Sequence, residues 1–241
     1  MTYLKNCNPA DLTEEFILSK DWDIIELDLA VDPVQLNSYY TVLKTELNHF
    51  CFNFNSKEYL KPEIYEKFVT NGQVGNYMGN VDAWSVSWPI ERDIPCPSKA
   101  QANRDVYTEL QGMDHMDFFA AAHPQEKYKF GIMNKLLEKL TEKALRQILI
   151  ARHPAGLRVL NHVDSNLKKL HIPLYTNNDA VFTFGKNDER VYQMEVGKMY
   201  VINPTVPHGT FNGGNTERVH LLSRIDIDYI PEVVGMRGII E

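Results

Sequence analysis

The hydrophobic pattern of the chain changes from a helical period to an alternating one near residue 145. Gly131–Leu145 spaces its apolar residues three and four apart with charges opposite, which predicts an amphipathic helix. Asp32 and Pro33 supply an N-cap and a first-turn proline for an earlier helix through LNSYYTVLKTEL. Asp23–Leu29, just before it, alternates as a strand does. A short helix is expected at Pro62–Val69, and residues 71–100, rich in Gly, Asn and Pro, are typical of a loop-rich surface.

After residue 145 many short alternating segments are joined by turn sequences such as Asn177-Asn178-Asp179. Strands are expected at Gln147–Arg152, Gly156–Val163, Lys168–Tyr175, Ala180–Phe184, Arg190–Val196, Lys198–Asn203 and Arg218–Tyr229. This pattern predicts a mainly β fold, a cupin-like jelly roll or double-stranded β-helix, with flanking N-terminal helices. We expect a single domain over residues 1–241. Its catalytic core is expected at 145–230, and residues 1–144 are expected to wrap that core and contribute substrate contacts.

Composition narrows the functional class. The 241 residues carry 25 Lys and Arg against 32 Asp and Glu, a net charge of −7, which argues against nucleic acid or an anionic membrane as the main partner. The three cysteines are widely spaced and form no CxxC, which fits a reducing interior. The first residues lack the apolar segment of a signal peptide, and no window approaches 18 apolar residues. We therefore expect a cytoplasmic protein.

Three residues of the alternating half have the spacing of metal ligands. His162 and Asp164 stand at i and i+2, so that on a strand they point to the same face. His208 follows 46 residues later, after a segment stiffened by two prolines. Two histidines and one carboxylate on one face of a metal form the arrangement of non-haem Fe(II) oxygenases. The alternative is that each histidine packs in the β core and binds no metal.

Arg218 lies ten residues after His208, at the start of the alternating run RVHLLSRIDI. A guanidinium at this point can bind a carboxylate through two hydrogen bonds, as a dicarboxylate co-substrate such as 2-oxoglutarate requires. Taken alone, Arg218 would be interpreted as a rim arginine in a surface ion pair. His220 would share the strand face of Arg218 and face the same cavity, or it would be a packed residue.

The segment from about Ile148 to Asp228 resembles the aspartyl/asparaginyl β-hydroxylases, a family of Fe(II)- and 2-oxoglutarate-dependent oxygenases that includes bacterial hydroxylases of free proline. The resemblance lies in the motifs NHVD, LHIPLYTNND, VGKMYVINPTVPHGTFNGG and ERVHLLSRIDI. It implies an enzyme that binds Fe(II), 2-oxoglutarate and O2 and hydroxylates an amino acid, free or in a peptide.

By position, the resemblance implies Fe(II) ligands at His162, Asp164 and His208, and Arg218 on the distal carboxylate of 2-oxoglutarate. His171 matches a family histidine that helps to hold the co-substrate, although a core histidine is an equal alternative. The animal members of the family, which lie in the endoplasmic reticulum, have glycine where this chain has Asp164. They also have a serine that contacts 2-oxoglutarate and would align near Ala151. The free-amino-acid hydroxylases keep the aspartate, so the animal peptide substrate is not carried over.

Further substrate contacts are expected from two pairs of residues. Trp84 and Trp88 in AWSVSW, four apart, would lie on one side of a strand and form an aromatic wall, unless they are core residues. Arg152 and Arg158 flank the first ligand strand and could bind a substrate carboxylate, or could be ordinary surface arginines.

Two other functions stay open. Arg218 and Arg224 form an R-x5-R pattern like that of oxidative nucleic-acid demethylases, but six residues of strand place the two arginines roughly 20 Å apart. The acidic charge also argues against this class. The second alternative is a non-redox cupin-like metal-binding protein, which would not need an arginine at position 218.

Overall fold

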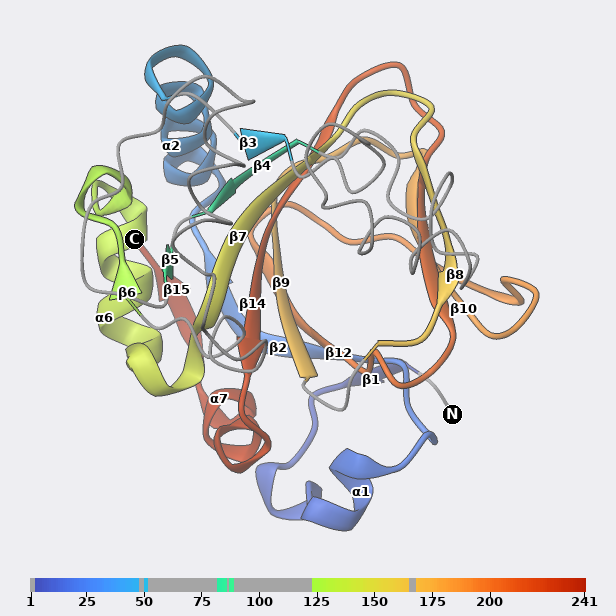
Figure 1. The fold of residues 1–241 in the computed structure, drawn as a ribbon. Coiled ribbons are helices and arrows are strands. Elements are labelled where there is room, and N and C mark those ends of the chain that lie inside the picture. The colour runs from blue at the N-terminus through green and yellow to red at the C-terminus, as the bar shows by residue number, and fades with distance from the viewer. Residues whose placement is uncertain (1–2, 48–49, 52–81, 86, 89–122, 165–167) are drawn as a thin grey trace, which may run out of the picture.

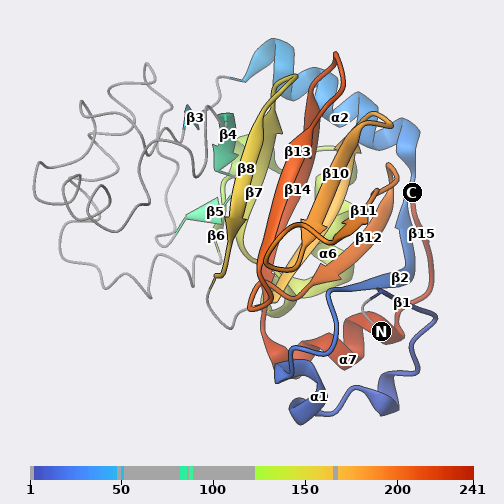
Figure 2. The ribbon, with the colours of Figure 1, turned by 90° about the vertical axis from the view of Figure 1, so that its right-hand side faces the viewer.

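The computed structural model describes residues 3–47, 50–51, 82–85, 87–88, 123–164 and 168–241. Two β-sheets face each other, and helices lie against the outer side of the larger one (Figures 1 and 2). The expected helix at Pro62–Val69 and most of the segment 71–100 lie outside the described residues.

The larger sheet has the strand order β1-β2-β12-β9-β14-β7-β4-β3, with β15 also pairing with β2. Its strands are β1 (Tyr3–Lys5), β2 (Ile24–Val31), β3 (Phe50–Cys51), β4 (Asp82–Ser85), β7 (Arg146–His153), β9 (Lys168–Tyr175), β12 (Lys198–Ile202), β14 (Arg218–Ile225) and β15 (Gly238–Ile240). The smaller sheet has the order β11-β10-β13-β8. It contains β8 (Arg158–His162), β10 (Ala180–Phe184), β11 (Arg190–Tyr192) and β13 (His208–Asn212). A separate pair joins β5 (Ser87–Trp88) and β6 (His123–Pro124).

The connections between the sheets define the fold. From β7 to β14 the chain crosses repeatedly between the larger and the smaller sheet, and only β10 and β11 are consecutive strands of the same sheet. The four central strands β12-β9-β14-β7 therefore face the four strands β11-β10-β13-β8. This is the topology of a double-stranded β-helix and confirms the predicted mainly β jelly roll with flanking helices.

The helices of the described residues are α1 (Glu14–Leu18), α2 (Pro33–Glu46), α6 (Ile132–Ala144) and α7 (Ile230–Gly235), with short 3-10 turns at Pro9–Asp11, Glu126–Tyr128 and Ile227–Tyr229. The α2 start is as predicted, because the Asp32 carboxylate accepts a hydrogen bond from the Val34 amide at 2.8 Å. The predicted helix at Gly131–Leu145 is confirmed by α6. None of the helices in the described ranges is long and apolar enough to cross a membrane.

Alternation along the central strands separates an apolar face from a polar one. Val219 and Leu221 of β14, with Ile172 of β9, belong to the large apolar core shared with Leu36 of α2 and Leu136 of α6. Because successive side chains of a strand point to opposite faces, Arg218 and His220 of β14 point the other way, between the sheets. A second apolar cluster, which includes Phe182, Phe184, Tyr200 and Ile202, lies beside them.

Some strand ends differ from the prediction. The run Arg218–Tyr229 keeps alternating, but β14 ends at Ile225, and the 3-10 turn Ile227–Tyr229 and α7 follow. The run Arg190–Val196 forms a strand only as far as Tyr192. The larger sheet also takes β1, β2 and β15 from near the two ends of the chain, so both halves contribute to it.

Candidate metal centre

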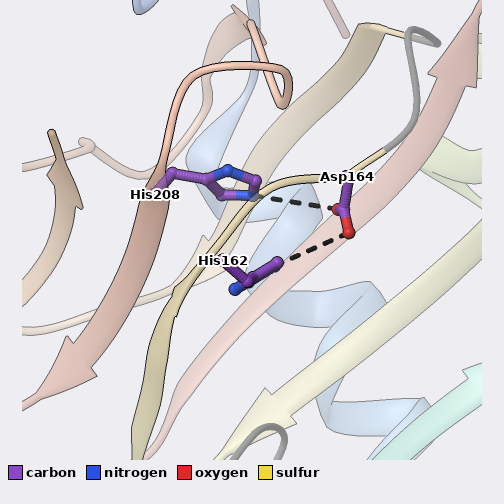
Figure 3. Close-up of side chains that lie close together, drawn as sticks. All are labelled: His162, Asp164 and His208. Atoms are coloured by element: carbon purple, nitrogen blue, oxygen red, sulfur yellow. Dashed lines mark ion pairs between the residues drawn. The ribbon is translucent and has the colours of Figure 1, made fainter. Parts of the chain in front are cut away.

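His162, Asp164 and His208 come together at one end of the smaller sheet (Figure 3). The Asp164 carboxylate oxygens lie 3.7 Å from His162 Nε2 and 3.8 Å from His208 Nε2. Metal bonds of about 2.1 Å to each donor bridge such separations. The three ligand atoms all lie within 4.8 Å of one another, and among the described residues this is the one group with such geometry. The donor set fits a divalent metal that prefers nitrogen and oxygen ligands.

Backbone pairing brings the three residues together. His162 ends β8 and His208 begins β13, and the two are directly paired in register. Asp164 follows two residues after His162, and its amide donates to the Pro204 carbonyl at 2.9 Å, which fixes it against the segment that leads to His208. At Gly209 a Cβ would lie 2.8 Å from the Val159 carbonyl, so glycine permits the close approach of β13 to β8.

Each histidine is oriented by its own backbone. The Nδ1 atom of His162 lies 2.7 Å from the Leu160 carbonyl, and that of His208 lies 3.0 Å from the Val206 carbonyl. Because a carbonyl only accepts, each Nδ1 carries the proton and donates it. Nε2 then carries the lone pair of each ring, which is the tautomer in which metal-bound histidines are commonly held.

The site favours the protonation states that a metal requires. Burial, then the neighbouring His162 and Lys169, lower the pKa of His208 to about 4, and burial also lowers the pKa of His162. Burial alone would raise the pKa of Asp164, but the Lys169 ammonium, its hydrogen bond and the two histidines lower it to about 2. At neutral pH the site therefore presents two neutral imidazoles and one carboxylate, which are metal-binding forms.

Lys169 donates a hydrogen bond to Asp164 and was not anticipated from the sequence. It lies on β9, and its charge also contributes to the low pKa of His171. No sequence motif marks this lysine. Its contact with Asp164 depends on the fold, which places residue 169 against residue 164.

Arg218 lies in the interior of the protein rather than on a rim. It is 2% exposed, and its guanidinium stacks 4.8 Å from the centre of the Phe182 ring. Burial lowers its pKa to about 9, so it stays charged at neutral pH. Within the described ranges no carboxylate pairs with it; its hydrogen bonds go to His153 Nδ1 at 3.2 Å and His220 Nδ1 at 3.1 Å. A buried cation without a counter-ion is costly, and it marks a place for an anion.

His171 and His220 present further unused polar atoms next to Arg218. Both ring nitrogens of His171 and the Nε2 atom of His220 are buried without a hydrogen-bond partner in the described part of the chain. The two rings lie 6.0 Å apart, and His171 packs edge-on against Phe182 at 5.0 Å. Buried polar groups are normally satisfied, so these atoms point to a polar ligand.

The two predicted substrate arginines have partners from the protein itself. Arg152 donates to Glu217 at 2.6 Å, and Arg158 donates to Asp188 at 2.6 Å with 55% of its side chain exposed. Their contact with a substrate carboxylate stays a prediction.

The expectation that Trp84 and Trp88 share one strand is wrong. Trp84 belongs to β4, which pairs with β7, whereas Trp88 belongs to β5, which pairs with β6 in a separate sheet. Their side chains lie outside the described part of the structure.

The sequence profile of the family described as aspartyl/asparaginyl β-hydroxylase matches residues 102–227, just over half of the chain. The chain belongs to this family. The match spans His162, Asp164, His208 and Arg218, so the geometry described above lies within the hydroxylase region. Among curated proteins, none matches the sequence.

Solved structures similar to this hydroxylase-family chain are distant. A cupin domain from Bordetella pertussis Tohama I shares 19% identity over 34% of this chain and 82% of its own, with a TM-score of 0.30. A protein with a double-stranded β-helix domain from Klebsiella pneumoniae shares 14% identity over 34% of this chain and 68% of its own, with a TM-score of 0.29. A protein from Thermus thermophilus shares 17% identity over 34% of this chain and 73% of its own, also with a TM-score of 0.29. Similarity this low has no bearing on function.

Proposed function

We propose that this family member is an Fe(II)- and 2-oxoglutarate-dependent hydroxylase of an amino acid, free or within a peptide. The observation that carries the proposal is Arg218, buried at 2% exposure without a carboxylate partner among the described residues, in a chain that also holds a two-histidine, one-carboxylate cluster. His171 lies near both, because the charges of Arg218 and of His208 each lower its pKa. When bound, iron and 2-oxoglutarate supply the chemistry in which one atom of O2 enters a C–H bond and the other oxidises 2-oxoglutarate to succinate and CO2.

His162, Asp164 and His208 would hold the metal on one side and leave its other positions open. The two histidines are preoriented, because the backbone carbonyls of Leu160 and Val206 accept hydrogen bonds from their Nδ1 atoms. Preformed ligands of this kind lower the cost of assembling the site.

Arg218 would bind the distal carboxylate of 2-oxoglutarate. A guanidinium matches the two oxygens of a carboxylate, and the low-polarity surroundings, with Phe182 against its face, strengthen such a pair. His171, whose ring nitrogens lack partners in the described part of the chain, lies close enough to the same cluster to donate to the ligand. The N–H groups of Arg218 and the one N–H of the neutral His171 thus match an anion with several acceptor oxygens.

The substrate is expected to be a small molecule or a peptide, as for the family. The residues that select it are expected partly in the first half of the chain. Arg152, Arg158 and His220 remain candidates on the described strands, and Trp84 and Trp88 remain candidates by position.

The deciding experiment measures 2-oxoglutarate binding and succinate formation by anaerobically prepared protein supplied with Fe(II), 2-oxoglutarate and ascorbate, with and without free amino acids. Arg218→Met is expected to weaken 2-oxoglutarate binding by about 10- to 100-fold, from loss of a charge-assisted pair, while Fe(II) binding is retained. Arg237→Met is a matched control, because Arg237 pairs with Asp28 on the surface with 48% of its side chain exposed. Binding of Fe(II) without any binding of 2-oxoglutarate would exclude the proposed oxygenase.

A further inference from the structure

Arg218 is held from two sides by histidine nitrogens. His153, the last residue of β7, is paired in register with Arg218 on β14, and its Nδ1 lies 3.2 Å from one terminal nitrogen of the guanidinium. His220, two residues further along β14, places its Nδ1 3.1 Å from the other terminal nitrogen. His153 and His220 are 6% and 1% exposed, so both contacts are shielded from water.

The geometry fixes the charge of both rings. A guanidinium has only donors, so each Nδ1 must accept, and its proton must lie on Nε2. Both imidazoles are therefore neutral. Burial, and then the charge of Arg218, lower the pKa of both histidines well below the usual value, in agreement with the hydrogen-bond pattern.

Another contact of this protein shows the more common arrangement, in which an arginine is bound by a carboxylate. Arg190 donates to both oxygens of the buried Asp23, at 2.7 and 3.1 Å, so a carboxylate both orients this guanidinium and neutralises it. At Arg218 the two acceptors are neutral instead. The guanidinium is oriented, but its positive charge is not cancelled by a described residue.

We propose that His153 and His220 are positioning residues that aim the Arg218 guanidinium at a carboxylate ligand without neutralising it. The inference rests on the proposed function of Arg218. With one N–H of each terminal nitrogen donated to a histidine, another N–H of each remains for the two oxygens of a carboxylate. The His220 Nε2–H, which has no partner among the described residues, adds a donor beside them.

The test is calorimetric binding of 2-oxoglutarate to anaerobic Mn(II)-loaded protein, which requires no turnover. His153→Asn keeps an oxygen acceptor near the position of Nδ1 and is expected to bind within about 3-fold of the wild type. His153→Asp has the same shape but adds a negative charge, and it is expected to weaken binding by at least about 10-fold because Arg218 then pairs with it. The Mn(II) affinity, measured separately, is expected to stay unchanged in both variants.

His220 provides a second, independent pair. His220→Asp is again expected to bind 2-oxoglutarate at least about 10-fold more weakly than His220→Asn, although the asparagine variant also loses the Nε2–H and falls below the wild type. Because Asn and Asp have nearly the same size, a folding defect from changed packing would affect both equally. Thermal melting of each variant checks this.

The outcomes separate the two proposals. If the Asn and Asp variants bind 2-oxoglutarate alike at both positions, the histidines do not preserve the charge of Arg218 and the inference is wrong, while the proposed function stands. If the wild type and Arg218→Met bind 2-oxoglutarate equally, the proposed function itself fails.

Discussion

His162 and His208 are directly opposite each other on β8 and β13, with their ring centres 4.4 Å apart. Both rings donate Nδ1–H to a carbonyl two residues earlier in their own chain segment. Both imidazoles are neutral, and both place Nε2 toward the Asp164 carboxylate (Figure 3). One divalent metal could bind all three groups at once.

Binding of a divalent metal is therefore expected to stabilise the fold. At a free metal concentration about 100 times Kd the gain is about 2.7 kcal/mol, which raises the melting temperature by about 5 to 10 °C for a chain of this size. His208→Ala is expected to abolish this shift, because two ligands alone bind weakly. The measurement is thermal unfolding of chelator-treated protein with added Mn(II) or Co(II). An equal shift in wild type and His208→Ala would mean that the metal binds elsewhere.

Gly209→Ala is expected to weaken metal binding by about 10-fold and to destabilise the fold by about 1 to 3 kcal/mol. The added Cβ would lie 2.8 Å from the Val159 carbonyl and 3.1 Å from Thr183 Oγ1, so β13 would have to move away from β8 and separate His208 from His162. Gly156→Ala is the control: its φ of +76° makes alanine strained, but nothing lies within 4 Å. It should lower stability and leave metal affinity unchanged, and equal losses of affinity would refute the steric argument.

How far the sequence predicts the fold depends on whether the signal is local. The bounds of β9, Lys168–Tyr175, agree with the prediction because alternation ends at an Asn-Asn-Asp turn. The end of β14 does not, since the RIDIDY sequence continues to alternate where the chain turns into a 3-10 helix. Strands β1 and β15 have three residues each and pair parallel with β2, a relation that no local pattern encodes.

In the candidate site, too, residues that are close in the sequence can be grouped from the sequence, whereas contacts between distant residues cannot. His162 and Asp164 are two residues apart, so their spacing groups them in the sequence, although β8 ends at His162 and Asp164 lies just beyond the strand. His153 carries no motif, and its contact with Arg218 spans 65 residues and depends on the β7–β14 register. The partners of Arg152 and Arg158 are likewise distant in sequence, 65 and 30 residues away, which is why the sequence left both as possible ligands of a substrate.

Glu217→Gln is expected to destabilise the protein at neutral pH by about 2 to 3 kcal/mol. Glu217 accepts hydrogen bonds from Tyr40 at 2.6 Å, Lys44 at 2.7 Å and Arg152 at 2.6 Å, which tie α2 and β7 to the residue before Arg218. Burial alone would raise its pKa, but these partners lower it to about 2.

The lowered pKa sets the pH range of this effect. A carboxyl with a depressed folded pKa stabilises above its unfolded value, near 4.5, and loses this contribution as the pH falls toward 2. Urea unfolding of both proteins between pH 7 and 3 should show the difference shrinking as acid is added. Glu232→Gln, an exposed position on α7, is the control and should change stability by no more than about 0.5 kcal/mol. A difference that stays constant down to pH 3 would contradict the assignment.

Lys168 is expected to give a second pH dependence of stability, which arises from a buried cation and not from a carboxylate. Its side chain is fully buried, its ammonium donates to Asn203 Oδ1 at 2.5 Å and lies 5.2 Å from the centre of the Trp22 ring, and burial lowers its pKa to about 8.

Between pH 8 and about 10.5 the unfolded chain binds more protons at Lys168 than the folded one, so the free energy of unfolding should rise with pH in this range, by up to about 3 kcal/mol. Lys168→Met should lack this rise and should be at least as stable as the wild type at pH 7, since a buried charge is removed. Lys135→Met on the exposed face of α6 serves as the control and should follow the wild type at every pH. The free energy of unfolding is measured with urea from pH 7 to 10. If it changes with pH in the same way in the wild type and in Lys168→Met, Lys168 is not the group that titrates.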